Sequence, residues 1–457
     1  MEKIIFLPIE TESRELDAKI VLASQLIKQG ISCFIGQHNV LNEIAPLFNG
    51  GIYIGKNIFL DAMKSNNDIY DMYKINGFSI LWYHEEGAIY GGDETKWKLV
   101  LKELLEPDRL SDDDVILCWG DFQKEFFSKT TTNAQMHVVG GYRLDIKEGS
   151  LLRKLIQNQS RVKEDNFILI NTNFTAGNHY LKDAVAYKQQ QIDSNANKVN
   201  KHRLLVEYAD DVKRMGFFSE MISYLLMKNP DKNFVLRPHP TESIEFWENV
   251  FYGFDNIKIT NKYSAVEWME RCSYIIQSGC TTAFEAYFLD KPIINYYPIE
   301  LSNTIDLTEG LSILCKTPHE VHEIINGTKN KEIIAYDNAL LGSLISNFKT
   351  DISTIKKIGE IAKESLSDKN KNNINYSKIR YLLKKIDMKN YLKQYPRYLF
   401  KDKLDAYRMA LSHFPGFKFE EIDSKVKYIN NINEVNMNLN FINKNLFVLS
   451  SRKKCVE

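Results

Sequence analysis

The chain has 457 residues with 59 basic and 59 acidic side chains, so its formal net charge is zero. Hydrophobic residues make up 44% and aromatic residues 12% of the sequence, which is typical of folded globular domains. The balanced charge argues against nucleic acid as a partner, and no apolar stretch approaches the roughly 20 residues of a membrane-spanning helix. The 6 cysteines form no C-x-x-C pair, and the N-terminus becomes charged too early for a signal peptide. These features predict a cytoplasmic protein of roughly two or three domains, with free thiols and no structural metal.

The first part of the chain alternates strand-like and helix-like patterns. An apolar run at residues 3–8 is followed by apolar residues at helical spacing, and a second apolar run begins at Ile31. Strand, helix and strand in this order predict a parallel α/β unit, and further strand-like runs follow up to residue 141. We expect residues 1–155 to form a Rossmann-like domain.

A second α/β pattern follows and predicts another Rossmann-like domain over residues 156–353. Its strand-like runs end near Asn171, Leu236, Gln277 and Tyr297. The polar stretch 189–201 is interpreted as a mobile loop or insertion. Residues 354–457 are rich in Lys and Asn and predict a helical C-terminal extension.

The sequence Arg237-Pro238-His239-Pro240 follows a strand-like run. Two prolines restrict the backbone around His239, and ligands of open α/β sheets bind at the carboxyl ends of strands. Arg237 could hold an anion there, and His239 could donate a proton near neutral pH. A structural turn with a buried histidine is an equally good interpretation of these residues alone.

A small polar loop follows the run that ends at Gln277 and leads into a helix. Hydroxyls and backbone amides of this loop would suit a phosphate, and Glu285 in the first turns of the helix could accept hydrogen bonds from ribose. Ordinary helix capping by Thr281 is the alternative. The loop residues predicted to contact phosphate are Ser278, Gly279, Thr281 and Thr282.

Other strand ends carry polar residues as well. Glu85 and Glu86 precede Gly87 after an apolar run, which suits either a general base or a solvated turn. Asn173 and Thr175 follow the first strand of the second half, where contact with a ligand and ordinary surface polarity are equally supported. Glu12 and Arg14 could also bind a ligand, although helix capping by Thr11 or Ser13 explains that segment as well. The acids at 112–114 are interpreted as a solvated turn without metal.

The motifs, taken in order along residues 1–350, resemble known families. Glu85-Glu86-Gly87, then His239-Pro240, then the hydroxyl loop are similar to the bacterial CMP-sialic acid transferases and to capsule-type Kdo transferases with a GT-B fold. The stretches 84–87, 140–145 and 277–286 also resemble surface carbohydrate biosynthesis proteins. The resemblance implies two Rossmann-like domains facing a central cleft, with C-terminal helices packed across both. It also implies that residues 1–155 form the acceptor-side domain and residues 156–353 the nucleotide-sugar-binding domain.

The resemblance also implies roles for these residues. Glu85, or less favourably Glu86, would be the base that deprotonates the acceptor, and His239 would contact the phosphate of CMP and protonate it as it leaves. The hydroxyl loop would bind the same phosphate, and neither metal nor cofactor is required. The chain has Gly-Cys-Thr-Thr where some relatives have consecutive serines, which leaves the exact phosphate ligands open.

We therefore expect a glycosyltransferase that moves a nonulosonic acid or Kdo-like sugar from a CMP-activated donor to a surface glycan or lipid-linked acceptor. The alternatives are a UDP-sugar or CDP-polyol transferase, an epimerase, or a catalytically silent sugar-binding protein. A basic segment of the tail suggests contact with an anionic membrane surface, although a solvated helix face explains it at least as well. This segment includes Lys378, Arg380, Lys384, Lys385 and Lys389.

Overall fold

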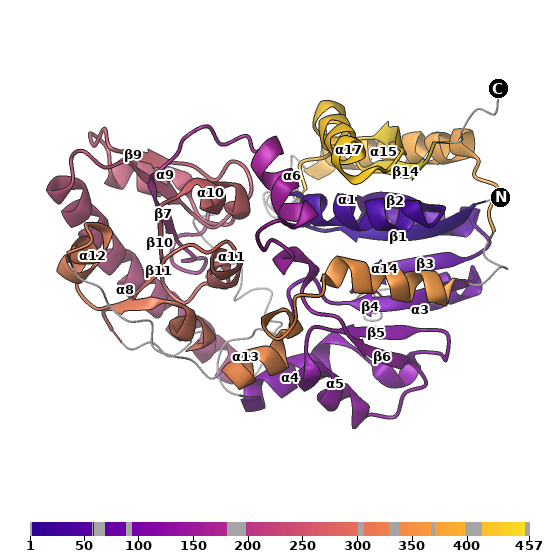
Figure 1. Cartoon of the computed structure of the whole chain (residues 1–457), viewed down its shortest axis with the longest axis horizontal. Helices are drawn as coiled ribbons and strands as arrows, with labels where there is room; N and C mark the ends of the chain where they lie inside the picture. The colour runs from indigo at the N-terminus through magenta and orange to yellow at the C-terminus, as the bar shows by residue number, and fades with distance from the viewer. Residues whose placement is uncertain are drawn as a thin grey trace. The chain divides into compact units, whose positions relative to one another are not determined.

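The computed structural model describes two compact units, each built around its own sheet (Figure 1). Unit 1 comprises Met1–Ile89, Trp97–Gln159 and Asn338–Glu457, and unit 2 comprises Tyr90–Lys96 and Ser160–Asp337. The residues described are 2–56, 58, 69–87, 94–180, 198–299, 306–328, 338–366, 371–397 and 414–452.

Unit 1 contains an eight-stranded sheet in the order β13-β14-β2-β1-β3-β4-β5-β6. The pairs from β2 to β6 are parallel, whereas β14 pairs antiparallel with both β13 and β2. The strands are β1 (Lys3–Ile9), β2 (Ile31–Gln37), β3 (Gly51–Gly55), β4 (Phe78–Tyr83), β5 (Val115–Cys118), β6 (Gln135–Val138), β13 (Met437–Asn443) and β14 (Leu446–Ser451).

Helices connect the strands of unit 1 and cover its sheet. Helix α1, which follows β1, packs against α14 and α17 from the C-terminal part of the chain (Figure 1). The helices are α1 (Glu12–Lys28), α2 (His38–Ile44), η1 (Ala45–Leu47), α3 (Ile69–Ile75), α4 (Glu94–Leu104), η2 (Pro107–Arg109), α5 (Asp121–Ser128), η3 (Tyr142–Leu144), α6 (Leu151–Gln159), α13 (Asn338–Leu344), η5 (Ser346–Phe348), α14 (Thr354–Ser365), α15 (Tyr376–Arg397) and α17 (Phe419–Asn433).

The prediction of a helical tail is confirmed for α14, α15 and α17, but it is wrong for the end of the tail, which forms the hairpin β13–β14. The residues of β14 from Leu446 to Leu449 are buried, and they extend the sheet by pairing with β2. In β13, apolar Met437, Leu439 and Phe441 alternate with asparagines, which is the period of a strand with one buried face. This alternation is present in the sequence, but the polar positions are asparagines, a residue type that is uncommon in strands, so the sequence did not predict a strand here.

Unit 2 contains a six-stranded, all-parallel sheet in the order β12-β11-β10-β7-β8-β9. Its strands are β7 (Ile168–Asn171), β8 (Phe234–Arg237), β9 (Ile257–Ile259), β10 (Tyr274–Gln277), β11 (Ile293–Tyr296) and β12 (Ile313–Cys315). Its helices are α8 (Lys198–Lys228), α9 (Ile244–Val250), α10 (Ala265–Arg271), α11 (Thr282–Phe288), η4 (Asp306–Leu311) and α12 (Pro318–Ile325).

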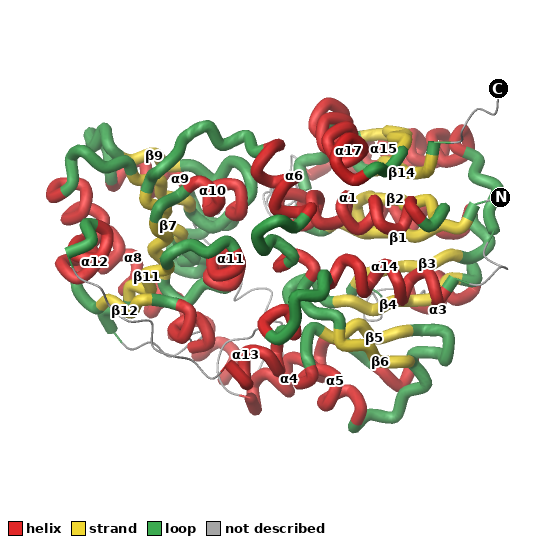
Figure 2. Tube along the Cα trace, viewed as in Figure 1, coloured by secondary structure: helices red, strands yellow, loops and turns green. Residues whose placement is uncertain are grey.

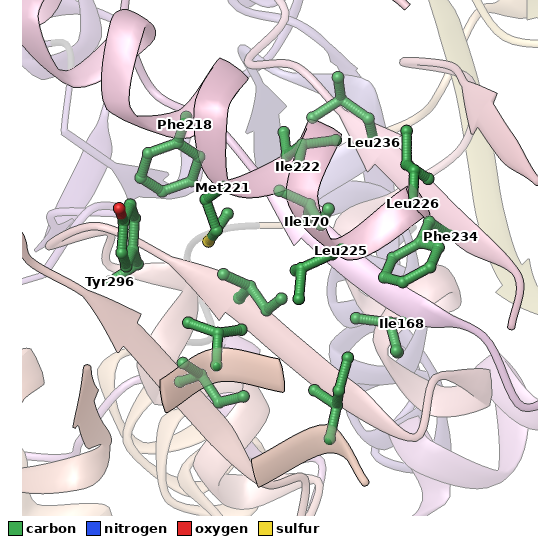
Figure 3. Packing of buried hydrophobic residues seen from close by; sticks show 14 of the residues in the cluster. Ile168, Ile170, Phe218, Met221, Ile222, Leu225, Leu226, Phe234, Leu236 and Tyr296 are labelled. Carbon is green, nitrogen blue, oxygen red and sulfur yellow. The ribbon is translucent and has the colours of Figure 1, made fainter. Parts of the chain in front are cut away.

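The core of unit 2 forms where α8 packs on one face of the sheet (Figure 3). Phe218, Met221 and Ile222 of α8 lie in one buried cluster with Ile170 of β7 and Leu236 of β8. Helix α8 begins inside the polar stretch that was interpreted as a loop, and residues 189–197 of that stretch lie outside the described residues. Residues 198–201, the last part of the polar stretch, therefore form the first turn of α8, the helix that covers this core.

Both units show the alternation of parallel strands and helices that the sequence predicts (Figure 2). The α/β class with two Rossmann-like units is therefore confirmed.

Candidate functional site

In each unit the strand order reverses beside the first strand. β1 lies between β2 and β3, and β7 lies between β8 and β10. Ligands of open parallel sheets bind at the carboxyl ends of the strands next to such a reversal. The predicted site residues follow β4 in unit 1 and β7, β8 and β10 in unit 2, so each unit carries its own group of candidates.

The acidic motif of unit 1 is a tight turn whose shape requires glycine. The amide of Gly87 donates to the carbonyl of His84 at 3.1 Å, and the indole nitrogen of Trp119 donates to the same carbonyl at 3.0 Å. Gly87 has a φ of +74°, and a Cβ there would lie 2.6 Å from the Trp119 ring. Glu85 and Glu86 are the two central residues of this turn.

The two carboxylates of the turn have different surroundings. Glu85 is buried, and its carboxylate accepts hydrogen bonds from Nζ of Lys19 at 2.6 Å and from the hydroxyl of Tyr142. Nε of Arg143 donates to the backbone carbonyl of Glu85 at 3.2 Å. Each carboxylate oxygen of Glu85 therefore binds a side chain of unit 1, which anchors the turn.

Glu86 is the exposed member of the pair. Its side chain is 54% exposed and forms an ion pair with Arg14 at 3.3 Å. Partial burial acts to raise the pKa of Glu86, but the charges of Lys56 and Arg14 outweigh it and lower that pKa. A second ion pair, between Glu10 after β1 and Lys56 after β3, lies at the strand reversal with an N–O distance of 2.8 Å. Glu10, Arg14, Lys56 and Glu86 therefore form one charged layer near the carboxyl ends of β1, β3 and β4.

Glu15 is a buried acid that the sequence interpretation missed. Its carboxylate accepts the backbone amides of Thr11 at 3.0 Å and of Glu10 at 3.2 Å, whereas the hydroxyl of Thr11 makes no capping bond. Burial, reinforced by the charge of Glu85, raises the pKa of Glu15 to about 7. The sequence signal was the spacing of four residues between Glu15 and Lys19, which places both on one face of α1.

Arg237, at the end of β8, is a buried cation. The residue is 8% exposed, and burial lowers the pKa of its guanidinium to about 10. Nη2 donates to the carbonyl of Tyr263 at 3.2 Å, and Nε has no hydrogen-bond partner within the described part of the chain. Glu267, whose charge acts on Arg237, is itself ion-paired with Arg161 at 2.8 Å. Arg237 is therefore suited to bind an anion.

His239 lies two residues further on, half-buried, in a turn closed by Glu242. The amide of Glu242 donates to the carbonyl of His239 at 2.8 Å, and the amide of His239 donates to Oε1 of Glu242 at 3.0 Å. The motif forms a structural turn, and the same turn holds His239 close to the buried Arg237. The two interpretations, an anion site and a structural turn, are therefore compatible. Glu242 was not singled out in the sequence, although it follows His239 by three residues.

The hydroxyl loop after β10 differs from the expected arrangement of free amides at a helix N-terminus. The amide of Gly279 donates to Oδ1 of Asn295 at 3.0 Å, and the amide of Cys280 donates to Oε1 of Gln277, so neither amide is available to a phosphate. Helix α11 has only 7 residues and begins at Thr282. Hydroxyls, rather than these two amides, are the groups that this loop can offer.

The hydroxyl residues of the loop occupy three different positions. Ser278 is buried, Thr281 is exposed, and Thr282 is half-buried, with its hydroxyl 3.4 Å from Nδ2 of Asn171. Thr281 occupies the N-cap position but its side chain makes no capping bond, so the capping alternative is not supported. Glu285 lies half-buried in the first turn of α11.

The loop after β7 is tied to the hydroxyl loop by Arg214 of α8. Nη1 of Arg214 donates to Oδ1 of Asn173 at 3.1 Å and to the carbonyl of Ser278 at 3.3 Å. Its ion-pair partner Asp211 accepts the amide of Ala176 at 2.7 Å. Thr175 lies half-buried in the same loop. Arg214 was missed because it lies far from the motifs in sequence, within a helix.

The acids at 112–114 are a solvated turn only in part: Asp112 and Asp113 are exposed in a turn, whereas Asp114 is structural. Asp114 is fully buried and accepts hydrogen bonds from the hydroxyl of Tyr70 at 2.6 Å and from the amide of Ile80 at 2.7 Å. Nζ of Lys74 lies 2.9 Å from Asp114. Among the described residues, no group of three or more His, Cys, Asp or Glu side chains is arranged to hold a metal ion.

Hydropathy along the described helices identifies none with the length and apolar character required to span a bilayer. No family model and no curated protein matches the sequence.

The fold is similar to several solved structures. One is Methanocaldococcus jannaschii UDP-GlcNAc 2-epimerase in complex with UDP-GlcNAc and UDP, at 13% identity and a TM-score of 0.45, covering 80% of this chain and 100% of that one. Another is the S. aureus MnaA–UDP structure, at 12% identity and a TM-score of 0.41, covering 82% and 100%. A third is the wall teichoic acid polymerase TagF, at 12% identity and a TM-score of 0.41, covering 79% and 88%. With TM-scores below 0.5, these similarities do not define a substrate.

Proposed function

We propose that the chain is a glycosyltransferase that moves a nonulosonic acid or Kdo-like sugar from a CMP-activated donor to a surface glycan or lipid-linked acceptor. The observation that carries the proposal is Arg237 at the strand ends of unit 2, close to His239. Its guanidinium is buried, and its Nε has no hydrogen-bond partner among the residues that the structure describes. No described carboxylate forms an ion pair with Arg237. A buried cation without such a partner is costly, and this cost is offset when an anion binds it. The anion we propose is the phosphate of the donor.

The chemistry of sugar transfer suits this group of residues. As the bond between the anomeric carbon and the phosphate oxygen breaks, negative charge grows on the phosphate. Fixed donors that face this charge stabilise the transition state, and removing one such donor typically costs a factor of about 10²–10³ in rate. Arg237 and His239 would supply those donors, and the hydroxyls of Ser278, Thr281 and Thr282 would complete the contacts. Asn173, Thr175 and Glu285 are proposed to contact the rest of the donor.

Unit 1 is proposed to bind the acceptor and to supply the base. The motif alone favours Glu85, but its carboxylate is buried between Lys19 and Tyr142. Glu86 has the exposed carboxylate, and its lowered pKa keeps it ionised at neutral pH. We therefore assign the base to Glu86 and the anchoring of its turn to Glu85. Arg14 would hold the acceptor against Glu86.

A different donor remains the second candidate, because Arg237 would bind the phosphate of a UDP-sugar or a CDP-polyol as well as that of CMP. The order of the motifs along the chain supports CMP. A silent sugar-binding protein would keep the charged layer of unit 1 without needing an anion at Arg237.

Thiol labelling distinguishes these candidates. Cys280 lies in the hydroxyl loop and is half-exposed, whereas the other described cysteines are buried. In a Cys455→Ser background, which removes a thiol outside the described residues, CMP is expected to slow the alkylation of Cys280 by iodoacetamide more than CDP or UDP does. Stronger protection by UDP would indicate a UDP-sugar donor, and stronger protection by CDP would indicate a CDP-polyol donor. Equal labelling with and without all three nucleotides would contradict a nucleotide site.

The cellular location is part of the same proposal. We place the enzyme in the cytoplasm, at the inner face of the membrane where lipid-linked acceptors lie. Lys378, Lys384 and Lys385 are exposed on α15 and would face anionic lipid. Nη2 of Arg380 instead donates to Asn440 at 2.7 Å, and the side chain of Lys389 lies outside the described residues.

A further inference from the structure

The sequence His239-Pro240-Thr241-Glu242 folds as one four-residue turn, and each residue has its own role in holding it. The ring of Pro240 fixes its φ near the value that the second residue of a type I turn needs. The amide of Glu242 closes the turn on the carbonyl of His239 at 2.8 Å. The carboxylate of Glu242 closes the turn a second time through the amide of His239. The backbone of His239 is therefore held at both its N–H and its C=O.

Glu242 also fastens this turn to the loop after β7. The residue is 2% exposed, and Oε1 accepts the hydroxyl of Thr172 at 2.8 Å and the amide of Phe174 at 3.1 Å, while Oε2 accepts the indole N–H of Trp247 at 3.1 Å. Burial raises the pKa of Glu242, and these hydrogen bonds to its charged form act in the opposite direction. One buried carboxylate thus sets the position of His239 relative to a second loop of the site.

Thr241 determines which nitrogen of the His239 ring carries the proton. The backbone amide of Thr241 lies 3.3 Å from Nδ1 of His239 and points its hydrogen at it, and the Thr241 hydroxyl lies 2.9 Å from the same nitrogen. A backbone amide can only donate, so Nδ1 must offer its lone pair. The neutral ring then has its proton on Nε2.

We propose that His239 acts as a neutral hydrogen-bond donor through Nε2–H to the phosphate of the donor, with Thr241 and Glu242 as positioning residues. This inference rests on the proposed function and changes one part of it, because the resemblance implies that His239 protonates the phosphate. A neutral ring would have to become an imidazolate anion to transfer its Nε2 proton, so it does not act as an acid near neutral pH. Double protonation would also direct Nδ1–H against the amide of Thr241.

The reaction balances without a proton from His239. The bond between the anomeric carbon and the phosphate oxygen breaks, and its electron pair remains on the phosphate, which Arg237 and Nε2–H stabilise. The acceptor oxygen forms the new bond to carbon, and its proton passes to Glu86. A phosphate monoester has a second pKa near 6, so a released nucleotide needs no proton at pH 7.5.

Nitrogen NMR of the full chain labelled with ¹⁵N-histidine measures the tautomer directly. The resonances of His239 are identified by their loss in His239→Gln. At pH 7.5 we expect a neutral ring with a bare Nδ1 and a protonated Nε2, both before and after CMP is added, with the Nε2 signal shifted by CMP. Thr241→Val keeps the amide and should keep this tautomer. An imidazolium or an Nδ1–H ring in the CMP complex would overturn the proposal.

Turnover supplies a second test. His239→Gln keeps an N–H donor, so we expect it to be at least tenfold faster than His239→Leu, whereas equal losses in both would indicate proton transfer. Glu242→Gln is expected to mix the tautomers and to lower kcat at least tenfold, and Glu248→Gln on the exposed face of α9 is the matched control. An unchanged tautomer and kcat in Glu242→Gln would remove its positioning role. If CMP shifts no resonance of unit 2, the proposed function fails, while the tautomer of the free protein still tests the inference.

Discussion

Replacing Glu15 by Gln is expected to change how the stability of unit 1 depends on pH. The pKa of Glu15 is about 7 in the folded chain because of burial and the charge of Glu85, against an ordinary value of 4.5. Between these two values the folded state binds more protons than the unfolded state, so the free energy of unfolding falls as pH rises. The difference in pKa corresponds to about 3 kcal/mol, at 1.36 kcal/mol per unit.

The effect has a defined window and a defined sign. The contribution of protonated Glu15 is fully present below pH 4.5 and is lost as pH rises through about 7. Glu15→Gln removes the ionisation, so its unfolding free energy should change less over this window than that of the wild type. The variant also replaces one acceptor of a backbone amide by an NH₂ group, which costs about 1 kcal/mol at every pH.

Amide hydrogen exchange of β1 and β4 provides the assay, because it reports the opening of unit 1 without requiring the whole chain to unfold in one step. Opening free energies at pH 5, 6, 7 and 8, corrected for intrinsic exchange, should fall by about 2.5 kcal/mol more in the wild type than in Glu15→Gln. Glu248→Gln in unit 2 is the control. Parallel pH profiles for wild type and Glu15→Gln would refute the assignment of a raised pKa to Glu15.

Four further predictions concern the turn and the tail. Gly87→Ala should lower the stability of unit 1 by about 2–4 kcal/mol in denaturant titrations, because of its positive φ and the contact with the neighbouring indole, and a loss under 1 kcal/mol would contradict this. Glu86→Gln should keep CMP affinity in calorimetry but lower transfer by about 10²–10⁴-fold, and normal transfer would exclude it as the base. Glu85→Gln should instead lower stability by about 3–5 kcal/mol, since it leaves a buried ammonium unpaired, and an unchanged melting temperature would argue against this anchoring role. Replacing Lys384 and Lys385 by Gln should weaken sedimentation with anionic vesicles at low salt, and equal sedimentation would remove the membrane contact.

Much of the fold could be predicted from the sequence because parallel strands are buried on both faces and appear as short apolar runs. The runs that became β1, β4, β8 and β10 were recognised in this way. The hairpin β13–β14 was missed, because its alternation is carried by asparagine rather than by charged residues.

The candidate site was predicted only where its residues are adjacent in sequence. Arg237 and His239 share one short motif, so their proximity needed no tertiary information. Lys19 and Arg214 lie in helices, and each contacts a strand-end loop 64 or more residues away in sequence. Such contacts are set by how a helix packs on its sheet, and hydrophobic periodicity does not specify them.

The central claim is that Arg237 binds the phosphate of a sugar nucleotide, and calorimetric titration of CMP into Arg237→Met tests it most directly. Met is a long apolar side chain, and Arg237 has no ion-pair partner among the described residues. Replacing such a buried charge by an apolar group tends to leave stability unchanged or higher. Lys262→Met, at an exposed cation in the loop after the neighbouring strand β9, is the matched control. We predict that wild type and Lys262→Met bind CMP equally, whereas Arg237→Met melts no lower and binds CMP at least a hundredfold more weakly. Equal CMP affinity in a folded Arg237→Met variant would contradict the claim.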